Sequence, residues 1–401
     1  MKRNFHKLGE KLIEGVITAS GLVTSITVLL IVFYLFKEGL GIFSQTPVAE
    51  GSLLAVNRQN QVSELSAAQV KDIFDQEITN WQEVGGANAP IKLFEIDDIT
   101  AYYTEEQLGP DFAFLPQRIN EVVAKDPHIL AYFPDEYLAH NFPGKRIELA
   151  NISLGDFLAG RQWYPTIQPA VQLGVLPLIL GTLWVSLGAI LIALPLGLAT
   201  AIYLAEIADP KVRNFLKPVI ELLAGIPSVV YGFFGLVVIV PLIQDVFGLP
   251  VGETALAGSI VLGIMALPTI ISVSEDAMRT TPRAMKEASL ALGANKWQTI
   301  YKVIIPYSVS GISTAAILGI GRAIGETMAV LMVTGNASVI PHTFLEPVRT
   351  IPATIAAELG EAPQGGIHYQ ALFALGCILF LMTLAINLTV DFVSAKKKEN
   401  R

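Results

Sequence analysis

The sequence predicts an all-α integral membrane protein with six transmembrane helices and a small α/β insertion between the first two helices. Composition is the first observation behind this prediction: of 401 residues, 52% are hydrophobic and 15% are charged, and the mean hydropathy is +0.53. These values are typical of the integral membrane class. The second observation is that the apolar residues form long runs, and the third is that residues 37–172 contain no such run.

Six apolar stretches are long enough to cross a membrane, because a spanning helix needs about 20 apolar residues. They lie at about 13–36, 174–205, 219–243, 254–275, 308–334 and 369–393. The first is longer than the apolar core of a signal peptide, which has about 7 to 15 residues, so we expect a transmembrane helix there. Pro195, Pro227 and Pro268 interrupt three stretches, which packed membrane helices tolerate when neighbours or water bind the freed backbone groups.

Basic residues in the short loops predict the orientation, since lysine and arginine accumulate on the cytoplasmic side. With the N-terminus inside, the loop at 245–253 lies outside and has no basic residue, and the outer loop at 335–368 has only Arg349. The segments assigned to the cytoplasm contain many: Lys211, Arg213, Lys217, Arg279, Arg283, Lys286, Lys296, Lys302, Lys396, Lys397, Lys398 and Arg401. We therefore predict that the N- and C-termini are both cytoplasmic.

The polar stretch at 37–172 is expected outside the membrane as a folded module. It holds 9 Lys and Arg against 19 Asp and Glu, so the acidity of the chain belongs to this region. A structureless loop of this length would be unusual. The sequence instead predicts a helix capped by Ser66, a turn at Gly85 and Gly86, and a strand at 91–94.

The expected domain organisation follows from these patterns. It comprises an N-terminal tail and first helix at 1–40, an extracytoplasmic insertion module at 41–160, a membrane core at 161–393 that includes a loop at 276–306, and a basic tail at 394–401.

The loop at 276–306 contains an amphipathic stretch between two apolar runs. Residues before Gly293 favour a helix, and a glycine permits the sharp turn needed between two short helices. Apolar residues then recur at helical spacing at Trp297, Ile300, Tyr301 and Ile304. Pro306 precedes the next apolar run, where its fixed φ suits a helix start. Periodicity alone leaves open whether this is an ordinary membrane-protein loop or a docking surface.

The spacing within this stretch resembles the EAA loop of ABC-transporter permeases. That pattern is Glu-Ala-Ala, three residues, Gly, nine residues and Ile-x-Leu-Pro, and it appears here as Glu287-Ala288-Ser289, Gly293 and Val303-Ile304-Ile305-Pro306. The three departures are small or conservative. In that family the loop seats in a cleft of a separate ATPase subunit, so the resemblance implies coupling roles for Glu287, Ala288, Gly293 and Pro306.

Three further strings resemble the membrane subunits of the phosphate-specific (Pst) ABC importer: PLILGTLWVSLGAILIALPLGLATAIYLAE, ELLAGIPSVVYGFFG and GRAIGETMAVLM. They cover roughly 160–393, and Trp163 with Pro165 favours the C-type permease. The resemblance implies the type I ABC importer permease fold in a bacterial inner membrane. It also implies a second permease subunit, ATPase subunits and an extracytoplasmic phosphate-binding protein as partners, besides membrane lipid and without nucleic acid.

Part of the insertion resembles periplasmic phosphate-binding proteins, through VSELSAAQVKDIFDQEITNWQEVGGANAPIKLF. In that family the segment leads into a Ser-Gly-Thr loop that binds phosphate, whereas here Phe94 is followed by EIDDITAYYTEEQ. We therefore expect a partial relative that binds phosphate weakly or not at all. Chance similarity within a small α/β module is the alternative.

Arg322 and Glu326 are candidates for the substrate path, because a charge inside a span costs at least about 2.5 to 3.5 kcal/mol. Four residues apart, they are expected on one helix face. One interpretation is a structural ion pair; the other is an oxyanion contact for Arg322, held in check by Glu326. Ser228, within ELLAGIPSVVYGFFG, and Glu221 are placed on the same path, although an interfacial carboxylate is commonly just solvated. The helix-breaking residues of that string permit a packing kink or open the backbone onto a cavity.

Several chemistries lack their sequence signatures. No GxxxxGK[ST] phosphate loop occurs, so ATP hydrolysis by a P-loop mechanism is expected in a partner and the chain is not expected to be an enzyme. The five histidines are scattered and the one cysteine is Cys377, so no metal site, cofactor or disulfide is predicted. The resemblance implies a permease subunit of an ATP-driven phosphate importer. The alternatives are a permease for another oxyanion and an ATP-independent membrane sensor or channel.

Overall fold

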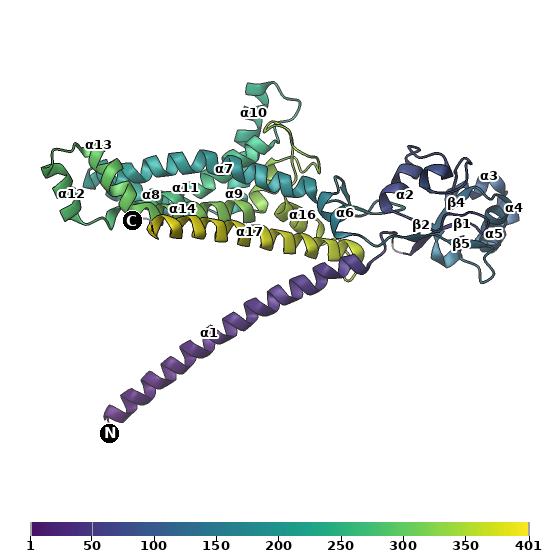
Figure 1. The fold of residues 1–401 in the computed structure, drawn as a ribbon, viewed down its shortest axis with the longest axis horizontal. Helices are drawn as coiled ribbons and strands as arrows, with labels where there is room; N and C mark the ends of the chain where they lie inside the picture. The colour runs from purple at the N-terminus through teal and green to yellow at the C-terminus, as the bar shows by residue number, and fades with distance from the viewer. Residues whose placement is uncertain (1, 50, 400–401) are drawn as a thin grey trace.

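The computed structural model describes the backbone of residues 2–49 and 51–399 and the side chains of residues 13–49, 51–389 and 392. The molecule is elongated, with a helical bundle at one end and an α/β module at the other, and α1 diverges from the bundle towards its N-terminus (Figure 1). In the described residues six helices are long and apolar enough to cross a membrane: Ile13–Ser44, Leu176–Ile207, Ser228–Phe247, Ala255–Arg279, Lys296–Gly325 and Ile367–Thr389. The predicted number of spans is confirmed.

The centre of the bundle is the packed pair α7 and α11. The helices of the bundle are α1 (Lys2–Gly41), α7 (Leu176–Ile202), α8 (Pro210–Ala224), α9 (Ser228–Phe234), α10 (Val240–Phe247), α11 (Ala255–Arg279), α12 (Arg283–Ala291), α13 (Lys296–Thr299), α14 (Ile305–Gly325), α15 (Met328–Val333), α16 (Ile351–Glu358) and α17 (Ile367–Glu399). A Cβ on Gly188 would lie 2.3 Å from Ser259 Oγ, so only glycine lets α7 and α11 approach this closely. The Ser259 hydroxyl also donates to the Val185 carbonyl at 3.2 Å.

The third predicted span, 219–243, is wrong as a single helix, because α8 and α9 are separate. Pro227 lies between them, and proline disfavours a helical conformation in the residue before it. The Tyr231 hydroxyl donates to the Leu223 carbonyl at 2.7 Å and so binds one of the free carbonyls at the end of α8. Pro195 and Pro268, by contrast, lie inside α7 and α11 without ending them.

The fifth predicted span, 308–334, is also interrupted. α14 ends at Gly325, and Glu326 is extended, with φ −73° and ψ 133°, before α15 begins. The short segments α9 and α15 pack closely, since a Cβ on Gly232 would lie 2.9 Å from the Cα atom of Ala329. Two interrupted spans therefore meet inside the bundle.

The α/β module contains a four-stranded sheet with the strand order β3-β4-β1-β5. Its elements are β1 (Ser52–Asn57), β2 (Glu64–Leu65), α2 (Ala67–Phe74), β3 (Lys92–Glu95), α3 (Ile99–Tyr102), α4 (Glu105–Leu108), α5 (Leu115–Lys125), β4 (Ile129–Pro134), β5 (Gly144–Arg146) and β6 (Glu148–Leu149). β1 runs antiparallel to β4 and β5, and β3 runs parallel to β4. Leu54 and Val56 of β1 belong to the core with α2, whereas Leu53 and Ala55 belong to the core with α5, so both faces of the sheet are covered.

Local predictions within the module are confirmed. The Ser66 hydroxyl accepts a hydrogen bond from Gln69 N at 3.2 Å and caps α2. Gly85 has a left-handed φ of +83°, as the predicted turn requires, and β3 covers most of the predicted strand. The parallel pairing of β2 with β6 adds a second, two-stranded sheet to the module.

The module is attached to the bundle through backbone pairing at its base. Val48, after α1, forms an antiparallel bridge with Ala170, shortly before α7. The Gln172 side chain donates to the Ala67 carbonyl at 3.1 Å and so joins β8 (Gln172–Leu173) to the start of α2. These contacts hold the module beside the spans from which it is inserted.

Candidate functional site

The predicted helix, glycine and helix of the EAA-like stretch are present as α12, Gly293 and α13. Gly293 has φ +86°, a conformation that favours glycine. The Asn295 side chain accepts a hydrogen bond from Gln298 N at 2.8 Å and caps α13. A π-helical turn at Ile300–Ile304 follows, and Pro306 lies in the first turn of α14, as predicted.

The outer side of this loop is apolar and exposed. Glu287, Ala288 and Gly293 are exposed. Beside them lies a group that we call the loop surface, whose exposed fractions are 51% for Leu290, 89% for Leu292, 64% for Trp297 and 61% for Tyr301. Ile300 and Ile304 are instead buried against α7 and α11, so the predicted shared apolar face is wrong. An exposed apolar group of this kind is typical of a surface that contacts another protein or lipid.

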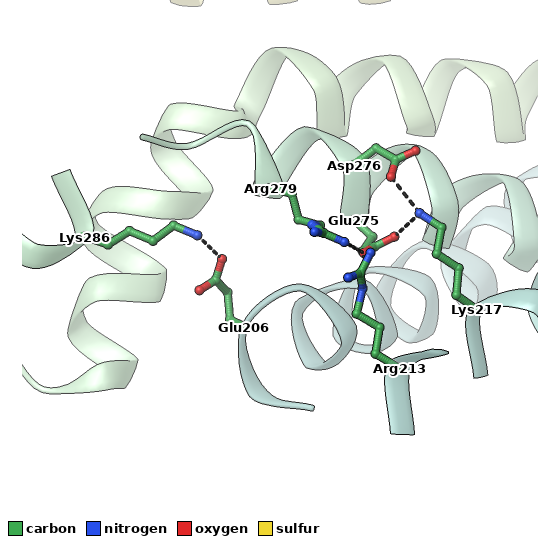
Figure 2. A network of polar contacts seen from close by, with 7 residues as sticks. All are labelled: Glu206, Arg213, Lys217, Glu275, Asp276, Arg279 and Lys286. Carbon is green, nitrogen blue, oxygen red and sulfur yellow. Dashed lines mark hydrogen bonds and ion pairs between the residues drawn. The ribbon is translucent and has the colours of Figure 1, made fainter. Parts of the chain in front are cut away.

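Charged side chains form a network at the end of the bundle that carries α12 and α13 (Figure 2). We call it the loop-end network; its members are Glu206, Arg213, Lys217, Glu275, Asp276, Arg279 and Lys286. Glu275, in α11, is 1% exposed and accepts hydrogen bonds from Arg213 Nε at 2.9 Å and Lys217 Nζ at 2.6 Å. Arg279 Nη1 adds a contact at 3.4 Å. A carboxylate this buried requires such partners.

Two more ion pairs complete the network. Lys217 Nζ lies 2.8 Å from Asp276 Oδ1, and Lys286 of α12 pairs with Glu206, just after α7. Burial alone would lower the pKa of Lys217, but its hydrogen bonds to Asp276 and Glu275 outweigh burial and raise that pKa above its ordinary value. Neither Glu206 nor Glu275 was among the site residues predicted from the sequence. The available signal was a carboxylate at the end of each apolar span, beside basic loops.

Arg322 and Glu326 lie at the break between α14 and α15, where both are partly buried. The expectation that they share one helix face is wrong, because α14 ends before Glu326. The Glu326 carboxylate instead accepts a hydrogen bond from Ala329 N at 3.4 Å, at the start of α15. Among the side chains that the structure describes, no ion pair within 4.0 Å joins Arg322 to Glu326.

Ser228 and Glu221 lie on either side of the other break. Ser228 begins α9 and is partly buried, whereas Glu221 is exposed on α8. Glu326 lines a narrow crevice with Ser186 and Thr350. The structure therefore places Ser186 and Thr350 beside the interrupted spans, and neither was predicted from the sequence to lie there.

A second cluster of buried and partly buried polar groups joins the start of the membrane core to α16 and α17. Glu358 Oε1 lies 2.7 Å from Arg349 Nη2, and its other oxygen lies 2.9 Å from His368 Nε2. The Trp163 indole donates to the same carboxylate at 3.1 Å. Burial alone would raise the pKa of Glu358, but the hydrogen bond with His368 and the charge of Arg349 outweigh it and hold that pKa below its ordinary value.

A cavity of about 450 Å³ lies at the base of the module, beside α2. The charges that line it are balanced, with Lys71 and Arg161 against Asp72 and Asp156. Lys71 Nζ is also bound by Asp75 Oδ2 at 2.6 Å. Such a lining provides no net attraction for an anion.

Together, the spans, the interrupted helices and the exposed loop are typical of the membrane component of a transport system. Residues 193–399 match the binding-protein-dependent transport system inner membrane component, and the chain belongs to this family. Residues 37–187 match a PBP superfamily domain.

Similar proteins with assigned names are permease proteins of transport systems. The probable ABC transporter permease protein YqgH of Bacillus subtilis is 43% identical over 243 residues, which cover 61% of this chain and 78% of that protein. The phosphate transport system permease protein PstC of Mesorhizobium japonicum is 39% identical over 249 residues, or 57% of this chain and 75% of the relative. PstC of Pasteurella multocida is 36% identical over 267 residues, or 61% and 82%.

Proposed function

We propose that this chain is a permease subunit of an ATP-driven phosphate importer, of the C type, with the type I importer fold. The observation that carries the proposal is the 36–39% identity to phosphate transport permeases over most of their length. The chain forms the phosphate path together with a second permease subunit. An extracytoplasmic phosphate-binding protein delivers the substrate to it.

ATP hydrolysis belongs to separate ATPase subunits. The chain contains no GxxxxGK[ST] loop, and the loop surface exposes four large apolar side chains where a partner is needed. Glu287, Ala288, Gly293 and Pro306 shape this contact. The positive charge of the short loops supports a cytoplasmic position for this contact and for both chain termini in a bacterial inner membrane, with the module at 41–160 outside.

The substrate path runs along the interrupted spans of the core at 161–393. Discontinuous helices line substrate sites in membrane transporters because their backbone groups are free to face a cavity. Arg322 supplies a guanidinium whose geometry suits an oxyanion. Glu326 limits the strength of that contact, since a site that passes its substrate on must also release it. Ser228 contributes a hydroxyl from α9, the segment that packs against α15. Glu221 lies at the solvent-exposed end of the path.

ATP-driven closure of the ATPase subunits moves α12 and α13, and the bundle changes between outward- and inward-facing states. Such a transition is a rigid-body movement of packed helices. Nucleotide shifts it only if the loop contacts the ATPase differently in the two states.

Uptake with competing anions tests this function. The chain is expressed with its partner subunits in a strain that lacks other phosphate importers, and labelled phosphate uptake is measured. We expect uptake that excess arsenate reduces, because it has the same shape and charge, and that excess sulfate or molybdate leaves unchanged. Equal competition by sulfate or molybdate would assign the chain to another oxyanion.

A further inference from the structure

The loop-end network contacts two helices that the apolar core does not hold: α8 through the group around Glu275, and α12 through the separate Lys286–Glu206 pair. Among their described residues, neither α8 nor α12 buries a single one. The second half of the loop differs, because Ile300 and Ile304 are packed in an apolar cluster with α7 and α11. A displacement of α12 therefore has one route into the bundle through α13 and the turn at Ile300–Ile304, and a direct connection from α12 to α7 needs another contact.

An ion pair provides that contact. Lys286 of α12 is 23% exposed and its partner Glu206, in the π-helical turn that follows α7, is 12% exposed. Within the loop, the Ser289 hydroxyl also lies 3.0 Å from Thr299 Oγ1, and this contact joins α12 to α13 at the start of the fifth span. Among the described side chains, Lys286 makes the ion pair that ties α12 to a membrane span.

Glu275 has the corresponding role for α8. Arg213 and Lys217 of α8 reach across to this one carboxylate of α11, which is 1% exposed. Figure 2 shows the side chains of α8 and α11 converging on it, with the Lys286–Glu206 pair to one side. Leaving a buried charge without its partner is strongly unfavourable, so helices joined in this way move together.

We propose that the loop-end network is the mechanical link that passes a displacement of α12 to α7 and α11, with Glu206, Glu275 and Lys286 as positioning residues. This inference rests on the proposed function. Lys286 makes the end of α7 follow α12. Glu275 makes α8 follow α11, which packs directly against α7, so the two central spans and the α8 segment shift as one unit.

Charge exchange tests the link. We expect Glu206→Lys and Lys286→Glu, each made in the assembled transporter in lipid vesicles, to retain the ATPase subunits. Each lowers the phosphate transported per ATP hydrolysed by at least about tenfold, because the pair is replaced by two like charges. The double variant restores the ratio to within about threefold of the wild type, since the pair is re-formed with its charges reversed.

The matched control exchanges Lys92 and Asp126, a pair at 2.5 Å in the module, where Lys92 is largely exposed. We expect this exchange to leave the ratio unchanged. If a single change prevents assembly, Glu206→Gln and Lys286→Gln provide the same comparison with no like charges, and a lowered ratio is again expected. The link is refuted if the single variants keep the wild-type ratio, or if the double variant is no better than the single ones.

A failure of the mechanical link gives a different result from a failure of the proposed function. A wild-type complex whose ATP hydrolysis is stimulated by its loaded binding protein but which moves no phosphate would refute the substrate. In that case the link is tested by measuring how strongly the loaded binding protein stimulates ATP hydrolysis, instead of by measuring phosphate transport. The single variants are expected to lose the stimulation and the double variant to regain it; stimulation that persists in the single variants refutes the link.

Discussion

Arg322 is a partly buried cation at the end of α14, beside an interruption of the spanning segment. We expect Arg322→Gln to reduce phosphate uptake by roughly 10- to 100-fold, since a hydrogen bond to a charged group contributes about 1.5 to 3 kcal/mol. Assembly with the ATPase subunits is expected to persist. Initial uptake rates and co-purification measure the two properties.

Arg146→Gln is the matched control for this change, because Arg146 is exposed on β5 of the module. We expect its uptake to equal that of the wild type. Normal uptake by Arg322→Gln would limit Arg322 to a structural role. The absence of an ion pair to Glu326 among the described side chains argues against that role, since the charge is not neutralised by its predicted partner.

Glu358 makes a second prediction at the scale of single residues. Its pKa is lower in the folded protein than the ordinary value of about 4.3. The carboxylate therefore stabilises the fold fully above that value, and the contribution is lost as the pH falls through the lower folded pKa. We expect Glu358→Gln to destabilise the protein by about 1 to 3 kcal/mol at pH 7, since the change removes charged hydrogen bonds.

Thermal unfolding in detergent at several pH values measures this effect. The difference in melting temperature between the wild type and Glu358→Gln should be present at pH 7, should shrink as the pH falls below about 4.3 and should vanish below the lower folded pKa. Glu361→Gln, in an exposed residue of the same region, is the control and should unfold like the wild type. A difference that is unchanged at low pH would contradict the assigned charge.

The loop of α12 and α13 exposes large apolar side chains, which we expect a partner protein to cover. A Cβ on Gly293 would meet no atom within 4 Å, so Gly293→Asp costs this chain only the left-handed backbone strain, about 1 to 2 kcal/mol. We expect the variant to fold but to lose the ATPase subunits. Glu287→Lys, on the exposed side of α12, is expected to do the same. Co-purification of the ATPase subunits measures both.

Gly365 is a close control for Gly293. It has φ +81°, and a Cβ there would likewise meet nothing within 4 Å, but it precedes α17, away from the loop surface. Gly365→Asp should therefore retain the ATPase subunits. Retention by Gly293→Asp and Glu287→Lys, together with intact transport, would remove the coupling role from this loop.

At the scale of the whole molecule, the module has its own sheet and two cores. We expect residues 40–170 to fold when expressed alone and to bind phosphate weakly or not at all, because the cavity at the base of the module has a balanced lining. Calorimetric titration with phosphate measures this, with a phosphate-binding protein as the positive control. Saturable heat near one phosphate per module would contradict the prediction.

Much of this architecture is readable from the sequence because apolar length and local turn chemistry act over short distances. Runs of about 20 apolar residues identify the spans. The cap at Ser66 and the left-handed turns at Gly85 and Gly293 follow from the chemistry of a few neighbouring residues. The family also follows from local strings, since motif spacing is preserved along the chain.

Tertiary structure alone decided which side chains meet. Hydropathy reports apolar length, not hydrogen bonding, so it could not reveal that Pro227 separates two helices whereas Pro195 and Pro268 do not, or that a helix ends before Glu326. Glu275 meets Arg213 across 62 residues of sequence, and Glu206 meets Lys286 across 80. Such pairs depend on how whole helices pack, and no local pattern records them. The sequence thus determined the number of spans, the loop and the family, whereas the packing of α7, α8, α11 and α12 decided how the loop is joined to the membrane core.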